Sequence, residues 1–470
     1  MTTYPPGPTF TMFDILKTQL MGALRPAQQG EGFGFLTAAM DWTKQYGDIV
    51  YWNFWPNQAF IVNHPDMLHE VLVTKADSFH KAPFYKLMLS RFLGNGILVS
   101  DGDFWRRQRK LAQPAFHHKR IESYAVNTVD FSLKLMQDWH DGQQINALDE
   151  MMKLTLAVVA KSLFDADVTG RSEIVGRNLD ELQQTSTEQS QSFLAMLIPQ
   201  WMPTSMNRRQ KAATKALDEI IMGFIRERRA SGEDKGDLLS MLLAAQDDDG
   251  NGMSDKEARD EAITLFLAGY ETTSNAMAWT WMLLSQNPEV EARLHEELDT
   301  VLAGRAPTFA DLPRLKYTEW VIKEALRLYP PAHGFGRQSI EDVEVGGFTI
   351  PKGSIVFIYP YIIHRDARWF PDPDAFKPER WANDFEKQIP KYAYIPFGGG
   401  PRICIGNQFA LMEARLILAT LAQRYRVRVH AEQPITPEPL ITLRPLGGVP
   451  AHLEIRQKSE VRNPLPAASV

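Results

Sequence analysis

The chain has 470 residues, of which 44% are hydrophobic and 23% are charged, a composition typical of a folded globular protein. Acidic residues outnumber basic ones by 57 to 51, giving a formal net charge of −6, which excludes a bulk electrostatic attraction for nucleic acid. A single cysteine excludes an intrachain disulfide and any metal site built on several thiolates.

Neither a secretion signal nor a membrane span is predicted. The first eight residues are polar and proline-rich, without the basic start and apolar stretch of a signal peptide. The longest charge-free run, 189–207, carries polar residues and two prolines, whereas a span needs about 20 mostly apolar residues. We therefore expect a cytoplasmic protein without a transmembrane segment.

The apolar pattern predicts a mainly helical protein of the α+β class. Apolar residues recur at spacings of three and four, which predicts helices over 101–112, 121–139, 212–229, 258–285, 317–328 and 408–424. Short strands are predicted over 49–52, 59–62, 355–358, 427–429 and 441–444. We expect an N-terminal segment (1–34), one domain with a large helical body and a small β-rich portion (35–456), and a flexible C-terminal tail (457–470).

A glycine-rich loop, 397–406, carries the only cysteine, Cys404, to the start of a predicted helix. The free N–H groups and positive dipole end of a helix N-terminus favour a thiolate, and a thiolate is a good axial ligand for haem iron. Glycines let a backbone approach a flat ring closely, and Arg402 could pair with a haem propionate. The alternative is a buried structural cysteine, the commoner role of a lone cysteine.

The loop resembles the haem-binding signature of the cytochrome P-450 family through Phe397, Gly398, Arg402, Cys404 and Gly406. Other family motifs follow in the same order, from about residue 35 to 455. The sequence is most similar to soluble bacterial fatty-acid hydroxylases and their microsomal relatives. The resemblance implies one haem domain of the cytochrome P-450 fold over 35–456, with haem b between a long oxygen-activating helix and the cysteine loop, and Cys404 as the iron ligand.

Three charged residues match a structural motif of the family. Glu324 and Arg327 are three residues apart and lie on one helix face, and Arg380 falls in the matching later segment. Alone, such a pair is usually a solvated surface pair. The resemblance implies a buried network of the three that holds the core around the haem loop.

Three further residues match positions that contact the haem propionates. Trp105 and Arg109 lie one helical turn apart, and an indole N–H and a guanidinium can both donate to carboxylate oxygens. The alternative is an ordinary basic amphipathic helix. Arg337 lies where the family often has another propionate-binding arginine.

The segment from Ala268 to Thr272 matches the oxygen-activation motif of the family. Dioxygen must receive protons before its O–O bond breaks. The resemblance implies that Glu271 supplies them and that Thr272 holds the oxygen or a water, while the small Ala268 and Gly269 leave room beside the haem. The alternative is a packed core helix with small residues at a helix crossing.

Substrate contacts are inferred by position in the family. Nearly all the candidates are apolar, which favours a lipid-like substrate such as a fatty acid or a terpenoid; they are Leu98, Leu267, Ala268, Ala332, His333 and Ile441. Each could instead be ordinary core, and a lone histidine is more often structural. The apolar segment 193–198, with Trp201 and Met202, corresponds to a mobile access lid in the family.

The resemblance implies a haem-thiolate monooxygenase that uses dioxygen and two electrons from an external ferredoxin or flavodoxin-type reductase system. A docking face for it, or simply a solvated basic surface, is formed by Lys110, His117, His118, Lys119, Arg120 and Lys391. Alternatives are a peroxygenase that uses hydrogen peroxide and a non-enzymatic haem protein. The Glu271–Thr272 pair argues against the peroxygenase.

Overall fold

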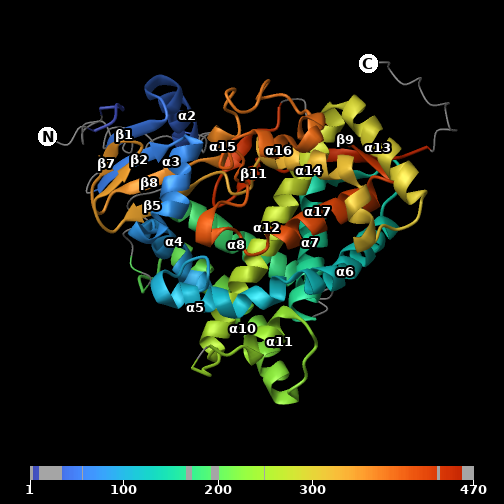
Figure 1. Ribbon diagram of the computed structural model, residues 1–470. Coiled ribbons are helices and arrows are strands. Elements are labelled where there is room, and N and C mark those ends of the chain that lie inside the picture. Colours follow the sequence, from blue (N-terminus) through green and yellow to red (C-terminus); the bar gives the residue numbers. More distant parts are fainter. Residues whose placement is uncertain are drawn as a thin grey trace.

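A computed structural model describes residues 4–9, 34–54, 57–165, 172–191, 199, 201–247, 249–430 and 434–457. It confirms the mainly helical class with a small β portion (Figure 1). Most of the expected N-terminal segment and nearly all of the expected tail lie outside the described residues. Among the described helices, none is long and apolar enough to cross a membrane.

The helices form the body of the molecule. In chain order they are α2 (Gly34–Tyr46), α3 (Pro65–His69), α4 (Pro83–Leu93), α5 (Gly102–Ala112), α6 (His118–Gln137), α7 (Ala147–Phe164), α8 (Ser172–Gln191), α10 (Ser205–Ser231), α11 (Leu238–Ala244), α12 (Asp255–Gln286), α13 (Pro288–Leu302), α14 (Lys316–Leu328), α15 (Pro360–Ile363), α16 (Phe385–Gln388) and α17 (Asn407–Leu421). All six predicted helices are present. The helix predicted over 212–229 begins earlier, because Thr204 caps its polar first turns.

Within the part of the chain that the structure describes, the strands form four small sheets. The largest has the order β1 (Ile49–Phe54), β2 (Asn57–Val62), β8 (Ile355–Ile358), β5 (Phe335–Ser339), β3 (Phe79–Lys81). Another has the order β4 (Gln144–Asn146), β12 (Pro450–Ile455), β9 (Tyr425–Val429). Two hairpins complete the set: β6 (Val343–Val345) with β7 (Phe348–Ile350), and β10 (Pro437–Pro439) with β11 (Leu443–Pro445).

The strand predicted over 441–444 is corrected by the β10–β11 hairpin. Pro439 pairs with Leu443 across it, so residues 440–442 form the turn and β11 begins at Leu443. The apolar run is therefore divided between a turn and a strand. This places Ile441 and Thr442 at the tip of the hairpin.

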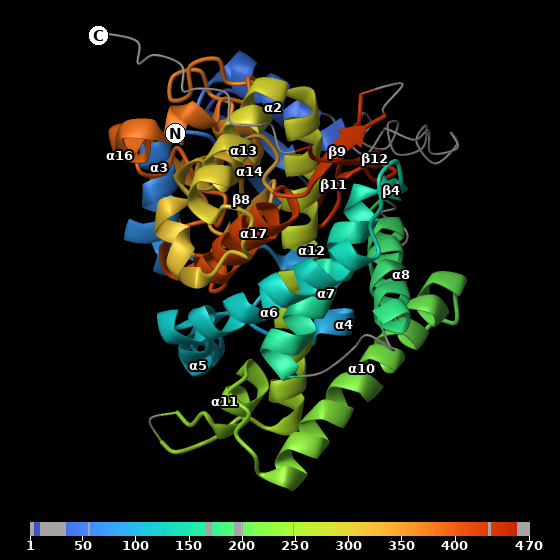
Figure 2. The same cartoon turned by 90° about the vertical axis from the view of Figure 1, so that its right-hand side faces the viewer.

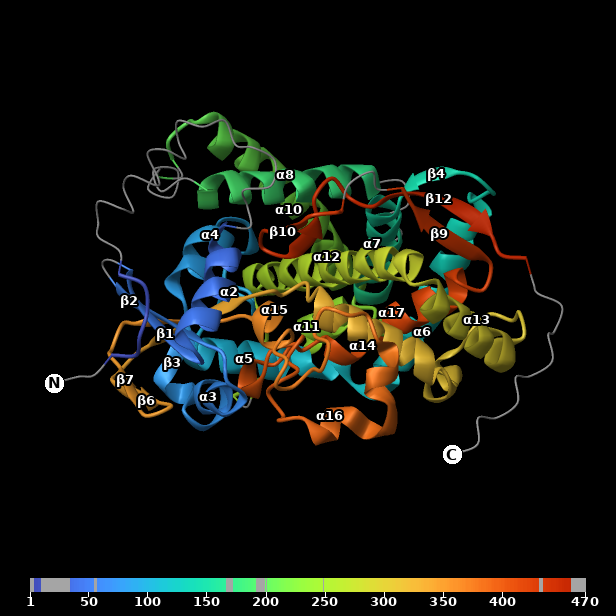
Figure 3. The ribbon, with the colours of Figure 1, turned by 90° about the horizontal axis from the view of Figure 1, so that it is seen from above.

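Helix α12 runs through the centre of the molecule, with α7, α10, α14 and α17 packed against it (Figures 2 and 3). It begins with a capping box, in which the Ser254 side chain accepts from the Glu257 N–H and the Glu257 carboxylate accepts from the Ser254 N–H. Its buried residues lie on nearly every side, so α12 is a core helix whose faces are all constrained by neighbours.

Two contacts fix other elements to α12. The indole N–H of Trp279 donates to the Leu443 carbonyl at 3.1 Å and anchors the β10–β11 hairpin. On α5, the Arg107 guanidinium binds Asp247 and Glu257 at 2.7 and 3.1 Å. The hairpin is thereby held near the C-terminal end of α12, and α5 is held near its N-terminal end.

Candidate active site

The loop that carries Cys404 lies immediately before α17. The Cys404 N–H donates to the Phe397 carbonyl at 2.9 Å, which closes the loop. Gly398 and Gly400 have φ angles of 72° and 66°, and a Cβ on Gly400 would lie 1.7 Å from the Leu72 carbonyl oxygen. The loop conformation therefore requires glycine at these two positions.

The Cys404 side chain lies deep in the protein, and the surface that it exposes is the wall of a cavity. Burial raises the pKa of the thiol, while a hydrogen bond from the Gly406 N–H and the nearby Arg109 charge lower it. These two groups favour the thiolate, and coordination to a metal cation would complete the deprotonation.

Glu324 and Arg327 lie on α14, and both are 0% exposed. The carboxylate of Glu324 receives paired hydrogen bonds from Arg327 at 2.9 and 3.0 Å, one from Arg380 at 3.2 Å and one from the Trp381 indole at 3.0 Å. Each guanidinium also donates to backbone carbonyls, those of His364, Pro373 and Ala375 for Arg327 and those of Pro371 and Asp372 for Arg380. Because every charge is paired and hydrogen-bonded, burial is tolerated.

The network reaches the cysteine loop through His364. Arg327 donates to the His364 carbonyl at 2.8 Å, and the His364 Nε2 accepts from the Ile395 N–H at 2.8 Å. Burial and the Arg327 charge hold the pKa of His364 well below its usual value, so the ring stays a neutral acceptor. Ile395 lies just before Phe397, so the network positions the start of the loop.

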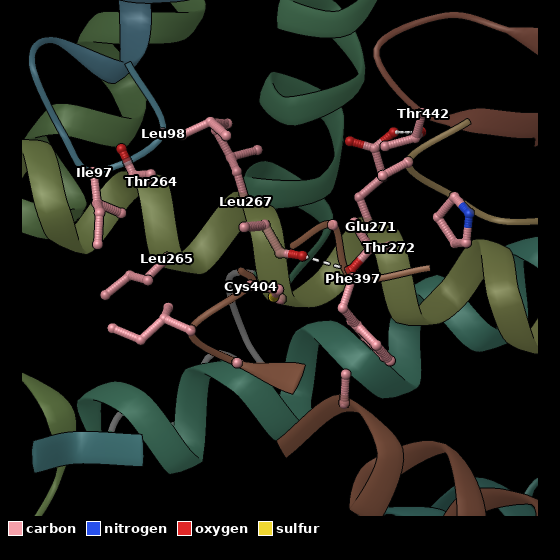
Figure 4. Close-up of a pocket in the computed structure, with 18 of the residues that line it drawn as sticks. Ile97, Leu98, Thr264, Leu265, Leu267, Glu271, Thr272, Phe397, Cys404 and Thr442 are labelled. Atoms are coloured by element: carbon pink, nitrogen blue, oxygen red, sulfur yellow. Dashed lines mark hydrogen bonds between the residues drawn. The ribbon is translucent and has the colours of Figure 1, made fainter. Parts of the chain in front are cut away.

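A cavity of about 410 Å³ separates the cysteine loop from α12 (Figure 4). The structure brings sixteen predicted residues to its wall. From the cofactor set and the acid–alcohol pair they are Cys404, Arg402, Trp105, Arg109, Arg337, Phe397, Gly398, Gly406, Ala268, Gly269, Glu271 and Thr272, and the substrate set adds Leu98, Leu267, Ala332 and Ile441 to Ala268.

His333 is the one predicted pocket residue that does not line this cavity. It lines a second cavity of about 340 Å³, whose wall is largely aromatic and which shares Ile441 and Phe335 with the first. Burial lowers the pKa of His333 to about 4, so the ring is neutral at physiological pH.

Four basic residues, Lys81, Arg109, Arg337 and Arg402, line the otherwise largely apolar cavity. Arg402 forms an ion pair with Asp101 and lies over the Trp105 ring at 4.1 Å, while Arg109 donates to the Ile403 carbonyl at 2.7 Å. Burial lowers the pKa of Arg337, Arg402 and Lys81. This excess of buried positive charge fits the two propionates of haem, and the apolar remainder fits its ring.

Thr272 and Glu271 are neighbours on α12, but their side chains bind different partners. The Thr272 hydroxyl donates to the Ala268 carbonyl at 2.7 Å on the side of the cavity that faces Cys404 (Figure 4). The Glu271 carboxylate turns towards the β10–β11 hairpin and accepts a hydrogen bond from the Thr442 hydroxyl. The two neighbouring side chains thus connect the cavity with the hairpin.

Sequence reasoning missed the partners of Glu271. Asn275 donates to the Thr442 hydroxyl at 3.0 Å, and Arg444 Nε lies 3.5 Å from Glu271 Oε1. Arg444 also reaches Asp180 on α8 at 3.8 Å. No local pattern could reveal these contacts, because residues 271 and 442 are brought together only by the docking of the hairpin. The single signal was Arg444, a charge next to an apolar run.

The predicted lid and docking face are partly described. Residues 193–198 lie outside the described residues, but Trp201 is 79% exposed. The basic residues cluster at the end of α5 and the start of α6, with Lys391 before the cysteine loop. All of them are exposed except Arg120, which donates to the Gly236 carbonyl at 3.1 Å.

Comparison with known proteins agrees with this architecture. The family described as Cytochrome P450 matches residues 26–449. Cyclooctatin synthase of Streptomyces melanosporofaciens is 40% identical over 86% of this chain and 89% of its own length. Cyclooctat-9-en-7-ol 5-monooxygenase of the same organism is 38% identical (82% and 83% covered), and pentalenene oxygenase of Streptomyces avermitilis is 35% identical (85% and 88% covered).

The chain belongs to the cytochrome P450 family. It is an oxidoreductase of the monooxygenase type, and haem is its cofactor. The resemblance stated from the sequence motifs is thus confirmed. The non-enzymatic alternative is set aside by the same finding.

Proposed function

We propose that this protein hydroxylates a cyclic terpenoid, using dioxygen and two electrons from an external ferredoxin or flavodoxin-type reductase system. Haem b is the proposed form of the cofactor, with Cys404 as the iron ligand. The observation that carries the proposal is an apolar cavity that joins Cys404 to an acid–alcohol pair on α12.

The substrate class is argued from the relatives and the cavity together. Two of the similar proteins are named for action on pentalenene and on cyclooctat-9-en-7-ol. The wall around Leu98, Leu267 and Ile441 offers apolar contact and few polar groups, which suits a cyclic hydrocarbon frame. Of the lipid-like classes expected from the sequence, the terpenoids are therefore favoured over the fatty acids.

In the proposed mechanism, thiolate-ligated haem supplies the reductive activation of dioxygen. Cys404 would hold the iron, and the Gly406 N–H and Arg109 would stabilise the negative charge of the thiolate. Trp105, Arg109, Arg337 and Arg402 would bind the propionates and orient the ring in the cavity. The apolar wall excludes water from the reacting carbon and holds the substrate for attack.

Proton delivery is assigned to α12. Thr272 would hold a water in the cavity through its hydroxyl, and Glu271 would pass protons to that water. In the described conformation Glu271 is bound to Thr442 and lies beside Arg444, on the route towards Asp180. A rotation of the Glu271 side chain would carry a proton from that exposed side to the cavity.

Electrons enter, in this proposal, from a partner docked on the cysteine side. The residues assigned to that face are Lys110, His117, His118, Lys119, Arg120 and Lys391. Basic groups there would attract an acidic redox protein, and the association would weaken with salt.

The first experiment is to reduce the purified protein, add carbon monoxide and record the Soret band. A strongly red-shifted band is expected from thiolate ligation, and Cys404→His should abolish the shift. Next, pentalenene, cyclooctat-9-en-7-ol, dodecanoic acid and hexadecanoic acid are titrated while the Soret band is followed. Terpenoid-induced shifts without any fatty-acid response would support the proposal, and the reverse pattern would refute the substrate class.

The peroxygenase alternative is tested in the same preparation. Turnover with hydrogen peroxide is compared with turnover supported by a ferredoxin and its reductase. A rate with peroxide far above the reductase-supported rate would favour the peroxygenase. Because Glu271 and Thr272 both stand at the cavity, we expect the reductase-supported rate to be the higher one.

A further inference from the structure

The loop between α4 and α5, residues 94–101, closes one side of the cavity against the N-terminal half of α12. Ile97 and Leu98 from the loop line the cavity together with Thr264 and Leu265 from α12 (Figure 4). Any shift of this loop therefore changes the shape of the space in which a substrate lies.

Two consecutive carboxylates of α12 hold the loop by its backbone. Asp260 accepts from the Asn95 N–H at 2.9 Å, and Glu261 accepts from the Ile97 N–H at 3.0 Å. Gly96 lies between these two amides, where a Cβ would stand 2.2 Å from the Thr264 hydroxyl oxygen. The loop backbone thus rests directly on α12, without room for an intervening side chain.

A buried lysine holds the same peptide from the other side. Lys81 on β3 donates to the Ile97 carbonyl at 3.1 Å and to the Leu98 carbonyl. Ile97 is therefore fixed at its N–H by a carboxylate and at its carbonyl by the amino group of Lys81. The hydrogen bond from the Ile97 N–H to the carboxylate is charge-assisted, and such bonds are about twice as strong as neutral ones.

Glu261 differs from Asp260 in how completely it is paired. Asp260 forms ion pairs with Lys256 and Arg259, whereas Glu261 is 1% exposed and its Oε1 has no hydrogen-bond partner among the described residues. Oε1 is therefore free to take a proton while Oε2 stays on the Ile97 N–H. Protonation would convert a charge-assisted bond into a weaker neutral one.

We infer that Glu261 is a positioning residue: as a carboxylate it fixes Ile97 and Leu98 against the substrate, and on protonation it loosens this wall and alters which carbon is oxidised. The inference rests on the proposed function only for its effect on the product.

The charges around Glu261 place this change near neutral pH. Burial, with the charges of Asp260 and Glu257 on α12, raises the pKa of Glu261, while the Ile97 N–H and Lys81 lower it, and the net result is a pKa of about 7. On the lysine side, burial, Arg402 and Arg337 lower the pKa of Lys81, and Asp101 and Glu261 raise it. The loop is accordingly held tightly above this pH and loosely below it.

The test is hydrogen exchange of the segment 94–98 in substrate-free, haem-loaded protein at pH 6 and pH 8, corrected for intrinsic exchange. In the wild type we expect about fivefold greater protection at pH 8, from the stronger charged bond. Glu261→Gln keeps an acceptor oxygen but no charge, so its protection should equal the low-pH wild type at both pH values. Glu289→Gln, an exposed change on α13, should behave as the wild type.

Equal wild-type protection at both pH values would overturn the inference, and this comparison needs no variant to fold. A Glu261→Gln variant that retains the wild-type pH response would overturn it too. Because these readouts need no turnover, they are independent of the proposed substrate class.

A second readout uses whichever of the four probe compounds is turned over. In the wild type, the ratio of oxidation positions should differ between pH 6 and pH 8, whereas in Glu261→Gln it should be constant. A change in total rate without a change in the product ratio would contradict a positioning role.

Discussion

Buried charged groups on the two sides of the cavity differ in how completely they are hydrogen-bonded. On the cysteine side, Glu324 and Arg327 are fully buried and their charged atoms are hydrogen-bonded. On the α12 side, Glu261 Oε1 lacks a hydrogen-bond partner among the described residues, and the pKa of Glu261 is raised to about 7.

The difference follows from what each side must do. A completely paired charge cannot change its state without a large loss of free energy, so it fixes backbone in place. An incompletely paired carboxylate lies closer to its protonated form and can exchange a proton at neutral pH. The buried charges on the cysteine side therefore have a structural role, and the α12 side holds the groups that can transfer protons.

The largest expected effect comes from breaking the paired side. Glu324→Gln leaves Arg327 buried without its counter-charge, which should cost about 3–5 kcal/mol and prevent stable haem incorporation. The measurement is haem content per polypeptide, with urea unfolding of any soluble fraction. Glu379→Gln is the control, because its partner Arg293 is 59% exposed and the loss should stay below about 1 kcal/mol.

The next largest expected effect is a loss of turnover without a loss of stability. Glu271→Gln retains the size of the side chain and an acceptor for Thr442 but cannot pass a proton, so turnover should fall about 10²–10⁴-fold. Haem content and the carbon monoxide spectrum should stay as in the wild type. If the haem is lost instead, then Glu271 belongs to the architecture and the contrast between the two sides fails.

Thr272→Ala should uncouple electron consumption from product. Without the hydroxyl, water in the cavity would no longer be held in a fixed position. Part of the electrons consumed would then be lost as hydrogen peroxide, and less product would form. The quantity to measure is product formed per electron consumed, together with peroxide. Thr272→Ser retains the hydroxyl and should restore coupling, and a Thr272→Ala variant with wild-type coupling would contradict the assigned role.

The smallest expected effect is a pH-dependent change in stability at Glu413, which lies between the two sides of the cavity. Glu413 on α17 is completely buried, and this burial raises its pKa to about 8. Because the folded state then holds a proton that the unfolded state releases, the stabilisation present below the ordinary pKa of glutamate is lost as pH rises towards 8.

Glu413→Gln removes this titration. The variant should gain about 2 kcal/mol relative to the wild type between pH 6 and pH 8, measured by urea unfolding at both pH values. An unchanged difference between the two proteins at the two pH values would show that Glu413 does not titrate in this range.

Local sequence patterns sufficed for much of the molecule. The long periodic segment 258–285 predicted α12, because a capped apolar run needs only neighbouring residues to form a helix. The division of residues 441–444 between a turn and a strand was not predictable, since it depends on pairing with Pro439 and on docking against Trp279.

The sequence by itself determined the class of this protein, because the residues around Cys404 and from Ala268 to Thr272 form two motifs at short spacings that can be read from the chain without its fold. Only the tertiary structure decided what surrounds them. Glu271 meets Thr442, and Glu261 meets the amide of Ile97, across sequence separations of 171 and 164 residues. Such contacts arise from packing, and no local pattern encodes them.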